Sequence, residues 1–202
     1  MKNRFRYLVY LIFLFFGSTF LIACVGSNQQ RIEEAKRIIM LTEELIEKRD
    51  LNKVRIFAQF LEDTEPKRIY SLDSINEINY KLIYNVVIED SKIVALISVP
   101  FNESGDYKVV ISHYFDMSGA TIAYRKKITF LDAVCTDEPI VSEKIIYFGK
   151  NGDSILKSEG LTDIKGNLIN EGEKCILNFS YPDEIFLNYA QIPYSEKLTR
   201  DR

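Results

Sequence analysis

The sequence predicts an α+β fold, in which one or two N-terminal amphipathic helices pack on an antiparallel β-meander of about six strands. Two observations support this fold class. Apolar residues recur every three or four positions early in the chain, which is the helical period, and every second position from Ile75 onward, which is the strand period. Turn residues separate the alternating segments and no helical pattern lies between them, so successive strands are expected to pair antiparallel.

The first helix is expected over residues 29–49. Ile32, Ala35, Ile38 and Ile39 begin an apolar stripe, and acidic and basic side chains occupy the other side of the same segment. A stripe this short, without sustained heptads, is typical of a helix that packs on its own domain rather than of a coiled coil.

A second short helix is expected after a break near Asp50. Leu51, Val54, Phe57 and Leu61 keep helical spacing, which places the end of this helix near residue 62. A strand over residues 54–60 is the alternative, because Val and Phe are also frequent in strands.

Three hairpins then supply the sheet, with turns at Asp90-Ser91, Ser118-Gly119 and Asn151-Gly152. Asn-Gly is the strongest short hairpin signal among them. One face of the sheet is expected to be solvated and the other covered by the helices. A further short helix is expected over residues 183–190. The strands are expected at residues 80–88, 93–99, 107–115, 122–130, 145–148 and 154–157.

The chain has 202 residues and a mass of 23.5 kDa, which suits a single domain with an appendage. Its formal net charge of −3 argues against a nucleic-acid partner, since phosphate binding needs a concentrated basic face. The sequence contains no Gly-x-Ser-x-Gly elbow, no glycine-rich phosphate loop and no Cys-x-x-Cys pair. We therefore expect no cofactor and no metal, and lean towards a protein that is not an enzyme.

The N-terminus has the features of an export signal. Lys2, Arg4 and Arg6 form a basic head, and an uncharged run over residues 7–23 follows it. A plain membrane anchor is the alternative, although seventeen residues interrupted by Gly17 and Ser18 lie at the short limit for spanning a bilayer.

Leu21-Ile22-Ala23-Cys24 resembles the lipobox of bacterial lipoprotein precursors. The resemblance implies that residues 1–23 are a signal peptide, that Cys24 receives the lipid, and that residues 24–29 tether a single ectodomain over residues 30–202. The partner it implies is a membrane, reached through fatty acyl chains such as palmitate. Two or more acyl chains would hold the protein firmly, since each buried methylene contributes about 0.8 kcal/mol.

Residue 25 is Val and not the Asp that marks inner-membrane retention in many enteric-type lipoproteins. The expected location in a Gram-negative cell is therefore the outer membrane, facing the periplasm. The same motif would anchor the chain to the single membrane of a Gram-positive cell. The ectodomain is similar in style to uncharacterised lipoproteins of Gram-negative anaerobes.

Export places the chain in an oxidising compartment, where the two other cysteines, Cys135 and Cys175, are expected to form one disulfide. A metal site or a nucleophilic thiol is the alternative, but partner spacings for either are missing from the sequence. Asp73-Ser74-Ile75 and Asp153-Ser154-Ile155 resemble the acceptor of an O-glycosylation system in some Gram-negative anaerobes. That resemblance implies Ser74 and Ser154 as candidate acceptors.

The function expected from these observations is a membrane-tethered envelope lipoprotein that binds a partner protein or small ligand without catalysis. One alternative is a small hydrolase or isomerase with a cone-like pocket that contains His113, the single histidine, and carboxylates. The other alternative is an inhibitor or assembly subunit that pairs through an edge strand. The in-register position of His113 with Val109, Ile111 and Phe115 favours a structural role for this residue.

Overall fold

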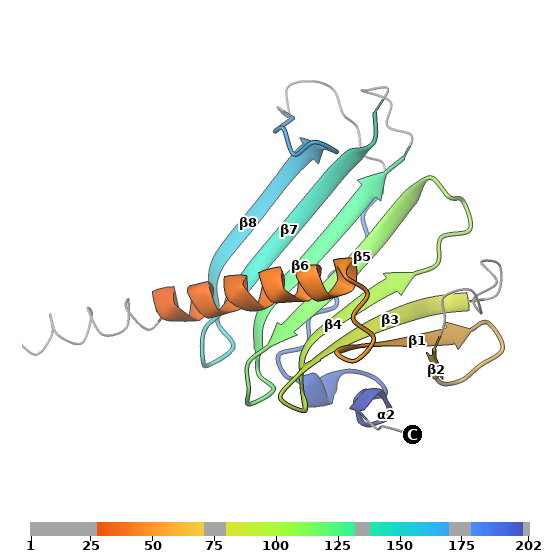
Figure 1. Ribbon diagram of the computed structural model, residues 1–202. Helices are drawn as coiled ribbons and strands as arrows, with labels where there is room; N and C mark the ends of the chain where they lie inside the picture. Colours follow the sequence, from red (N-terminus) through yellow and green to blue (C-terminus); the bar gives the residue numbers. More distant parts are fainter. Residues whose placement is uncertain (1–27, 71–79, 132–137, 170–178, 200–202) are drawn as a thin grey trace, which may run out of the picture.

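The computed structural model describes residues 28–70, 80–131, 138–169 and 179–199. Within them, eight strands form one antiparallel sheet in the order β2-β1-β3-β4-β5-β6-β7-β8 (Figure 1). Consecutive strands are neighbours from β3 to β8, so this part is a meander. The strands are β1 (Val54–Phe60), β2 (Lys67–Ile69), β3 (Tyr80–Glu89), β4 (Lys92–Pro100), β5 (Tyr107–Phe115), β6 (Thr121–Phe130), β7 (Ile140–Phe148) and β8 (Ser154–Asp163).

One face of the sheet, which we call the helix face, contacts a single long helix whose described residues are 28–47 (Figure 1). Ala35, Ile38 and Leu45 on this helix are buried against sheet residues such as Ala95 and Tyr147. The apolar stripe of this helix therefore packs on its own domain, as the sequence predicts. Burial of this stripe supplies the main attraction between the helix and the sheet.

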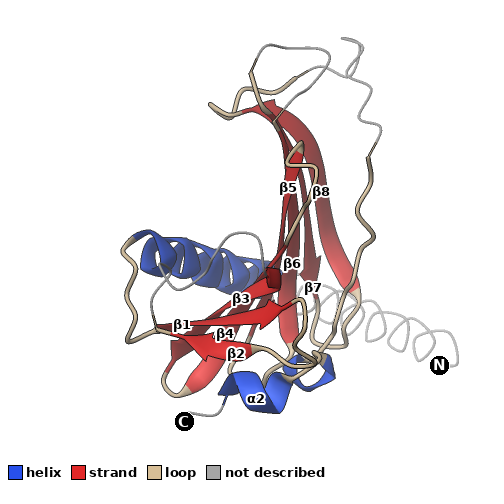
Figure 2. Ribbon diagram, turned by 90° about the vertical axis from the view of Figure 1, so that its right-hand side faces the viewer, coloured by secondary structure: helices blue, strands red, loops and turns tan. Residues whose placement is uncertain are grey.

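The opposite face is covered by the C-terminal segment (residues 179–199), which runs along the sheet on the side away from the helix (Figure 2). The segment contains a 3₁₀ turn, η2 (Tyr189–Gln191), and a short helix, α2 (Ser195–Thr199). Ile192 and Leu198 are buried against Phe57, Leu96 and neighbouring sheet residues. The solvated face expected from the sequence is thus largely occupied by the chain's own end.

The expected α+β class, with an amphipathic helix on an antiparallel meander, is confirmed, with eight described strands in place of about six. The expected second helix is wrong and its strand alternative is right, because residues 54–60 form β1. Val54, Phe57 and Ala58 have helical spacing, whereas Val54, Ile56 and Ala58 have strand spacing. Pairing with β2 and β3 satisfies the backbone on both sides of this segment and selects the strand.

The short helix expected over residues 183–190 is also wrong. Residues 183–188 form no helix, and the 3₁₀ turn η2 begins only at Tyr189. The segment pairs with the sheet instead: Thr121 N donates to Leu187 O at 3.0 Å, and Tyr189 N donates to Gly119 O at 2.9 Å. The Asn151-Gly152 turn is confirmed, and Gly152 adopts a φ of +79°, which glycine reaches without steric cost.

A buried ion pair fixes one end of the long helix to the sheet. Arg31 Nη1 lies 3.0 Å from Asp116 Oδ2, with only 8% and 15% of the two side chains exposed. Arg31 Nε also donates to Phe148 O at 2.8 Å. Burial raises the pKa of Asp116, but hydrogen bonds from Ser118, Arg31 and Ala120 outweigh it and lower that pKa overall. The contact therefore joins the helix to the turn after β5 and to the end of β7.

We predict that Arg31→Leu destabilises the protein by about 3 kcal/mol, because the substitution leaves the buried Asp116 carboxylate without its cation. The matched control on the same helix is Arg37→Leu. Arg37 is 3.9 Å from Glu89 and its side chain is 60% exposed, so its loss should cost less than about 1 kcal/mol. Urea denaturation of both variants measures the difference, and equal losses would contradict a special role for Arg31.

Candidate functional site

Most of the residues singled out in the sequence lie outside the described residues. Cys24, Cys135, Cys175 and Ser74 belong to this group, so lipidation, the disulfide and the first candidate glycosylation site stay predictions. Ser154 is described: it is the first residue of β8 and its side chain is exposed. A hydroxyl in this position is accessible to solvent, as any enzyme that modifies it would need.

His113 lies on β5 and faces the C-terminal segment. Only 2% of the residue is exposed, and its Nε2 is 3.1 Å from the backbone carbonyl of Glu184. Neighbouring rings enclose the imidazole, with centroids 5.2 Å away at Tyr124 and 5.4 Å away at Phe186. Burial lowers the pKa of His113 to about 4, although the Glu184 carbonyl acts in the other direction. His113 is therefore neutral at physiological pH and helps to hold the C-terminal segment on the sheet.

A small cavity of about 70 Å³ adjoins His113 and is lined mainly by apolar side chains, among them Leu82, Leu96 and Phe186. Glu184 is the one acidic residue among the described residues that line it, and it meets His113 through its backbone. The hydrolase or isomerase alternative requires a cleft with at least two carboxylates near this histidine. The described residues that line this cavity do not include two carboxylates.

In the described ranges, no group of three or more His, Cys, Asp or Glu side chains is arranged to hold a metal ion. Among the described residues, no helix is both long and apolar enough to cross a membrane.

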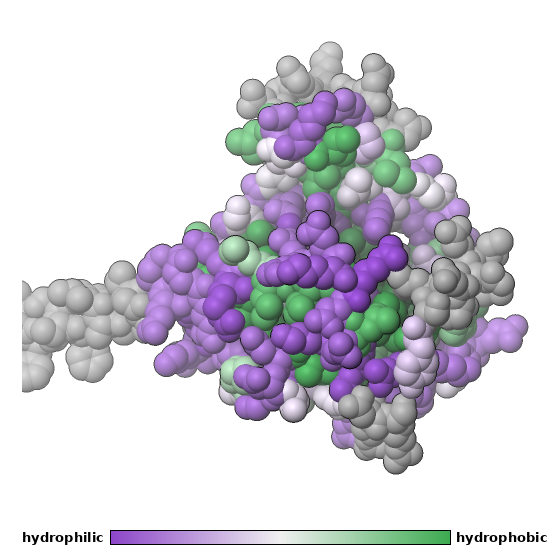
Figure 3. Space-filling view, in the orientation of Figure 1, coloured by the Kyte–Doolittle hydropathy of each residue, from purple (hydrophilic) through white to green (hydrophobic). Residues whose placement is uncertain are grey.

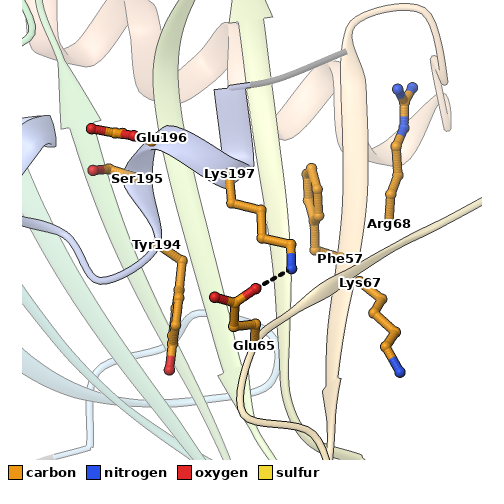
Figure 4. Close-up of a pocket in the computed structure, with 8 residues that line it drawn as sticks. All are labelled: Phe57, Glu65, Lys67, Arg68, Tyr194, Ser195, Glu196 and Lys197. Atoms are coloured by element: carbon orange, nitrogen blue, oxygen red, sulfur yellow. Dashed lines mark hydrogen bonds and ion pairs between the residues drawn. The ribbon is translucent and has the colours of Figure 1, made fainter. Parts of the chain in front are cut away.

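A cavity of about 720 Å³ lies between the β1–β2 hairpin and α2 (Figure 4). Figure 4 shows Lys197 of α2 and Glu65 of the hairpin pointing toward one another, and their charged atoms are 2.5 Å apart. Tyr194 Oη donates to Thr64 O at 2.8 Å. These polar groups bind each other, so their main effect is to tie α2 to the hairpin.

A different hollow lies on the helix face, over β6, β7 and β8 beyond the reach of the long helix. We call it the open groove. Figure 2 shows these strands rising past the helix, and Figure 3 shows apolar side chains exposed there among polar ones. Its volume is about 440 Å³. The residues that line it are Lys127, Val141, Glu143, Ile145, Ser158, Glu159, Gly160, Thr162, Asp163, Ile164, Gly166 and Leu168.

The boundary between the helix and the open groove is set by Arg125. Its guanidinium contacts Glu43 of the long helix, and its Nη2 is 2.5 Å from Glu143 Oε1 on β7. Burial disfavours the charged guanidinium, but the hydrogen bonds that Arg125 donates to Glu43 and Glu143 raise its pKa overall. The helix is thereby held at this position, and none of its described residues lines the groove beyond it.

The outer edge of β8 borders the open groove. Near the C-terminal end of β8, the loop that follows the strand pairs with this edge: Ile169 N donates to Leu161 O at 2.9 Å, and Asp163 N donates to Asn167 O at 3.0 Å. Backbone groups alternate in direction along a strand, so those of Lys157 and Glu159 point outward as well. No described residue pairs with the backbone of either one on that side.

The two edges of the described sheet differ strongly. β2 has three residues, whereas β8 has ten and is exposed along most of its length. Long unpaired edges are usually shortened, covered or charged in soluble proteins, because they pair readily with other chains. β8 carries two charges, and Lys157 Nζ lies 2.7 Å from Glu159 Oε2. It also leaves apolar surface open, because Leu156 is 45% exposed and Leu168, beyond the end of the strand, is 79% exposed.

Sequence reasoning found only the first four residues of β8. Gly160 and the polar residues around it break the apolar alternation, so the second half of the strand gives no strand signal. An inhibitor or assembly subunit that pairs through an edge strand needs an exposed edge, and β8 has one. The candidate functional site is accordingly the open groove together with the outer edge of β8.

Comparison with protein-family models, with curated proteins and with solved structures finds no match for this chain.

We predict that the free energy of unfolding falls as the pH is lowered from 7 to 4.5, partly through His113. The pKa of this residue is about 4 in the folded state against about 6.5 when unfolded, so the unfolded chain binds the extra proton in this window. The contribution is complete above pH 6.5 and decreases by about 2 kcal/mol at pH 4.5.

His113→Gln keeps an amide donor for the Glu184 carbonyl but cannot ionise. Its stability loss relative to wild type should therefore shrink by about 2 kcal/mol between pH 7 and pH 4.5. Denaturant titrations of both proteins at several pH values test this, and parallel pH profiles would contradict the neutral buried histidine.

Proposed function

We propose that this chain is a membrane-tethered envelope lipoprotein whose ectodomain binds an extended polypeptide segment along β8. The single observation that carries the binding half of the proposal is the long outer edge of β8, whose backbone groups at Lys157 and Glu159 have no partner among the described residues. Strand addition at such an edge satisfies main-chain hydrogen bonds on both chains.

Charge and shape narrow the kind of partner. Lys157 and Glu159 lie on one face of β8, so an added strand would place an acidic residue opposite Lys157 and a basic residue opposite Glu159. On the helix face, Leu156 and the open groove offer apolar contacts to side chains of the same added strand. The proposed partner is therefore an extended segment with one charged and one largely apolar side.

The tether half of the proposal is supported by the lipobox-like Leu21-Ile22-Ala23-Cys24 and by the short distance along the chain from Cys24 to the long helix. In a Gram-negative cell we propose the outer membrane, periplasmic side, because residue 25 is Val. The proposal includes no catalytic step.

Metabolic labelling with a fatty-acid analogue tests the tether. We expect the wild-type chain to incorporate the label and the Cys24→Ala chain to lose it, because the thiol of Cys24 is the proposed attachment point. A Cys135→Ala variant is the control and should keep the label. Labelling that survives Cys24→Ala would refute this site.

Photo-crosslinking in the native cell tests the partner. A photoreactive residue introduced in place of Lys157 should give a discrete adduct, whereas one in place of Lys67 on β2 should not. Glu159→Pro removes the outward N–H but keeps the β7 pairing, since that N–H points away from β7. Loss of about 1.4 kcal/mol of interaction would lower the adduct about tenfold.

The control for that experiment is Glu159→Thr, which removes the charge and keeps the outward N–H. It should retain most of the adduct if backbone pairing carries the binding. Equal adduct yields from the proline and threonine variants would contradict strand addition at β8. An adduct of the same size from a photoreactive residue at position 67 would contradict it as well.

A further inference from the structure

One end of the long helix is fixed to a defined edge of the sheet. Arg31 contacts Asp116 in the β5–β6 turn and donates to Phe148 O at the end of β7, so the helix passes beside the β5–β6 turn (residues 116–120) and the β7–β8 turn (residues 149–153). We call these two turns with Leu187 the turn edge. Figure 1 shows both turns at the same end of the strands, on the side where the helix enters.

The sequence between Cys24 and this helix is short. Three residues separate Cys24 from Asn28, the first described helical residue, so the two Cα positions are at most about 14 Å apart in any conformation. Asn28 precedes Arg31 by less than one helical turn. A lipid on Cys24 would therefore hold the turn edge close to the membrane surface.

The composition of the turn edge suits contact with lipid. Met117 is 42% exposed in the β5–β6 turn, and Leu187 is 44% exposed beside the β7–β8 turn. Leu187 lies between the two turns: its side chain reaches within 3.2 Å of the Cβ position of Gly152, and its carbonyl accepts from Thr121 N at 3.0 Å. Lys150 is exposed in the β7–β8 turn, where it can meet a lipid phosphate.

Two acidic residues belong to the turn edge. Asp153 is exposed in the β7–β8 turn, which also carries the exposed Lys150, whereas Asp116 is neutralised inside the protein. Asp116 is paired with Arg31, so its carboxylate is not presented as a free charge to an anionic surface. Single exposed apolar residues are ordinary on protein surfaces. Here, however, two of them lie at the edge that the length of the tether brings to the membrane.

We infer that the turn edge is the membrane-facing surface of this protein, with Met117 and Leu187 in the boundary between headgroups and acyl chains; this rests on the proposed lipidation of Cys24. The open groove and Leu168 lie toward the opposite ends of the strands. A ten-residue strand such as β8 spans about 30 Å, which exceeds the reach of the tether. The groove and the far half of β8 therefore point away from the lipid.

The chain contains no Trp, so one introduced Trp is the sole indole reporter in the protein. We would express the full-length precursors of Met117→Trp and Leu168→Trp in cells that lipidate and process them, purify the processed proteins and mix them with phosphatidylcholine vesicles. The lipids carry bromine near the carbonyl end of the acyl chains, where it quenches indole fluorescence at short range. Both positions are exposed, so the fold should tolerate either substitution, and circular dichroism verifies it.

For Met117→Trp we expect emission to fall about twofold relative to vesicles without bromine, and for Leu168→Trp we expect no change. Vesicle flotation in the same samples reports the tether separately. Protein that floats, but is quenched at position 168 and not at position 117, would overturn the inference while leaving lipidation intact. Protein that stays at the bottom of the gradient would overturn the proposed lipidation and the inference with it.

Discussion

The eight described strands form a sheet with two apolar faces, and the described residues supply one long helix and one extended segment to cover them. Burial of apolar area is the dominant favourable contribution to folding, so each face must find a cover. The helix covers the helix face over the middle of the sheet, and residues 179–199 cover the opposite face. What neither element reaches is the open groove over β6–β8 and the edge of β8.

Two arginines fix where the helix lies, and they do so at separate points along it. Arg31, near the first described turn, joins it to Asp116 and Phe148, whereas Glu43, three turns later, contacts Arg125 on β6. Apolar burial alone is not directional and would tolerate a range of helix positions on a flat sheet. The polar contacts select one position, and that position leaves the open groove uncovered.

The strands that the sequence predicts well are those with one clear period. Apolar or aromatic residues occupy every second position from Tyr80 to Ile88 in β3, and every second position of β5 except His113, and the Asn151-Gly152 turn has few alternatives in a hairpin. β1 was ambiguous because Val54, Phe57 and Ala58 fit a helix as well as a strand, and only long-range pairing with β2 and β3 decides between them. The C-terminal segment gave a false helical signal for the same reason: its backbone partners lie on β6, about 65 residues away.

The candidate site was less predictable than the fold. A strand edge and a groove arise from what other elements fail to cover, and no local pattern in the sequence encodes that. Consecutive strand residues face opposite sides of the sheet, so Lys126 lies beside Asp183 under the C-terminal segment and Lys127 lies in the open groove. The lone histidine was expected to be structural from its register, and its enclosed position beside Phe186 agrees with that interpretation.

The charges on β8 have two physical consequences that act together. Lys157 and Glu159 make indiscriminate pairing of this edge costly, because an apolar strand laid against them would strip water from both charges. The same two charges favour a strand that presents the complementary pair, since opposite charges across strands attract and like charges repel. Protection against aggregation and selection of a partner therefore require the same residues here. If the proposed tether at Cys24 holds the protein at a membrane by its opposite end, both effects are needed, because neighbouring copies on one surface would otherwise meet edge to edge.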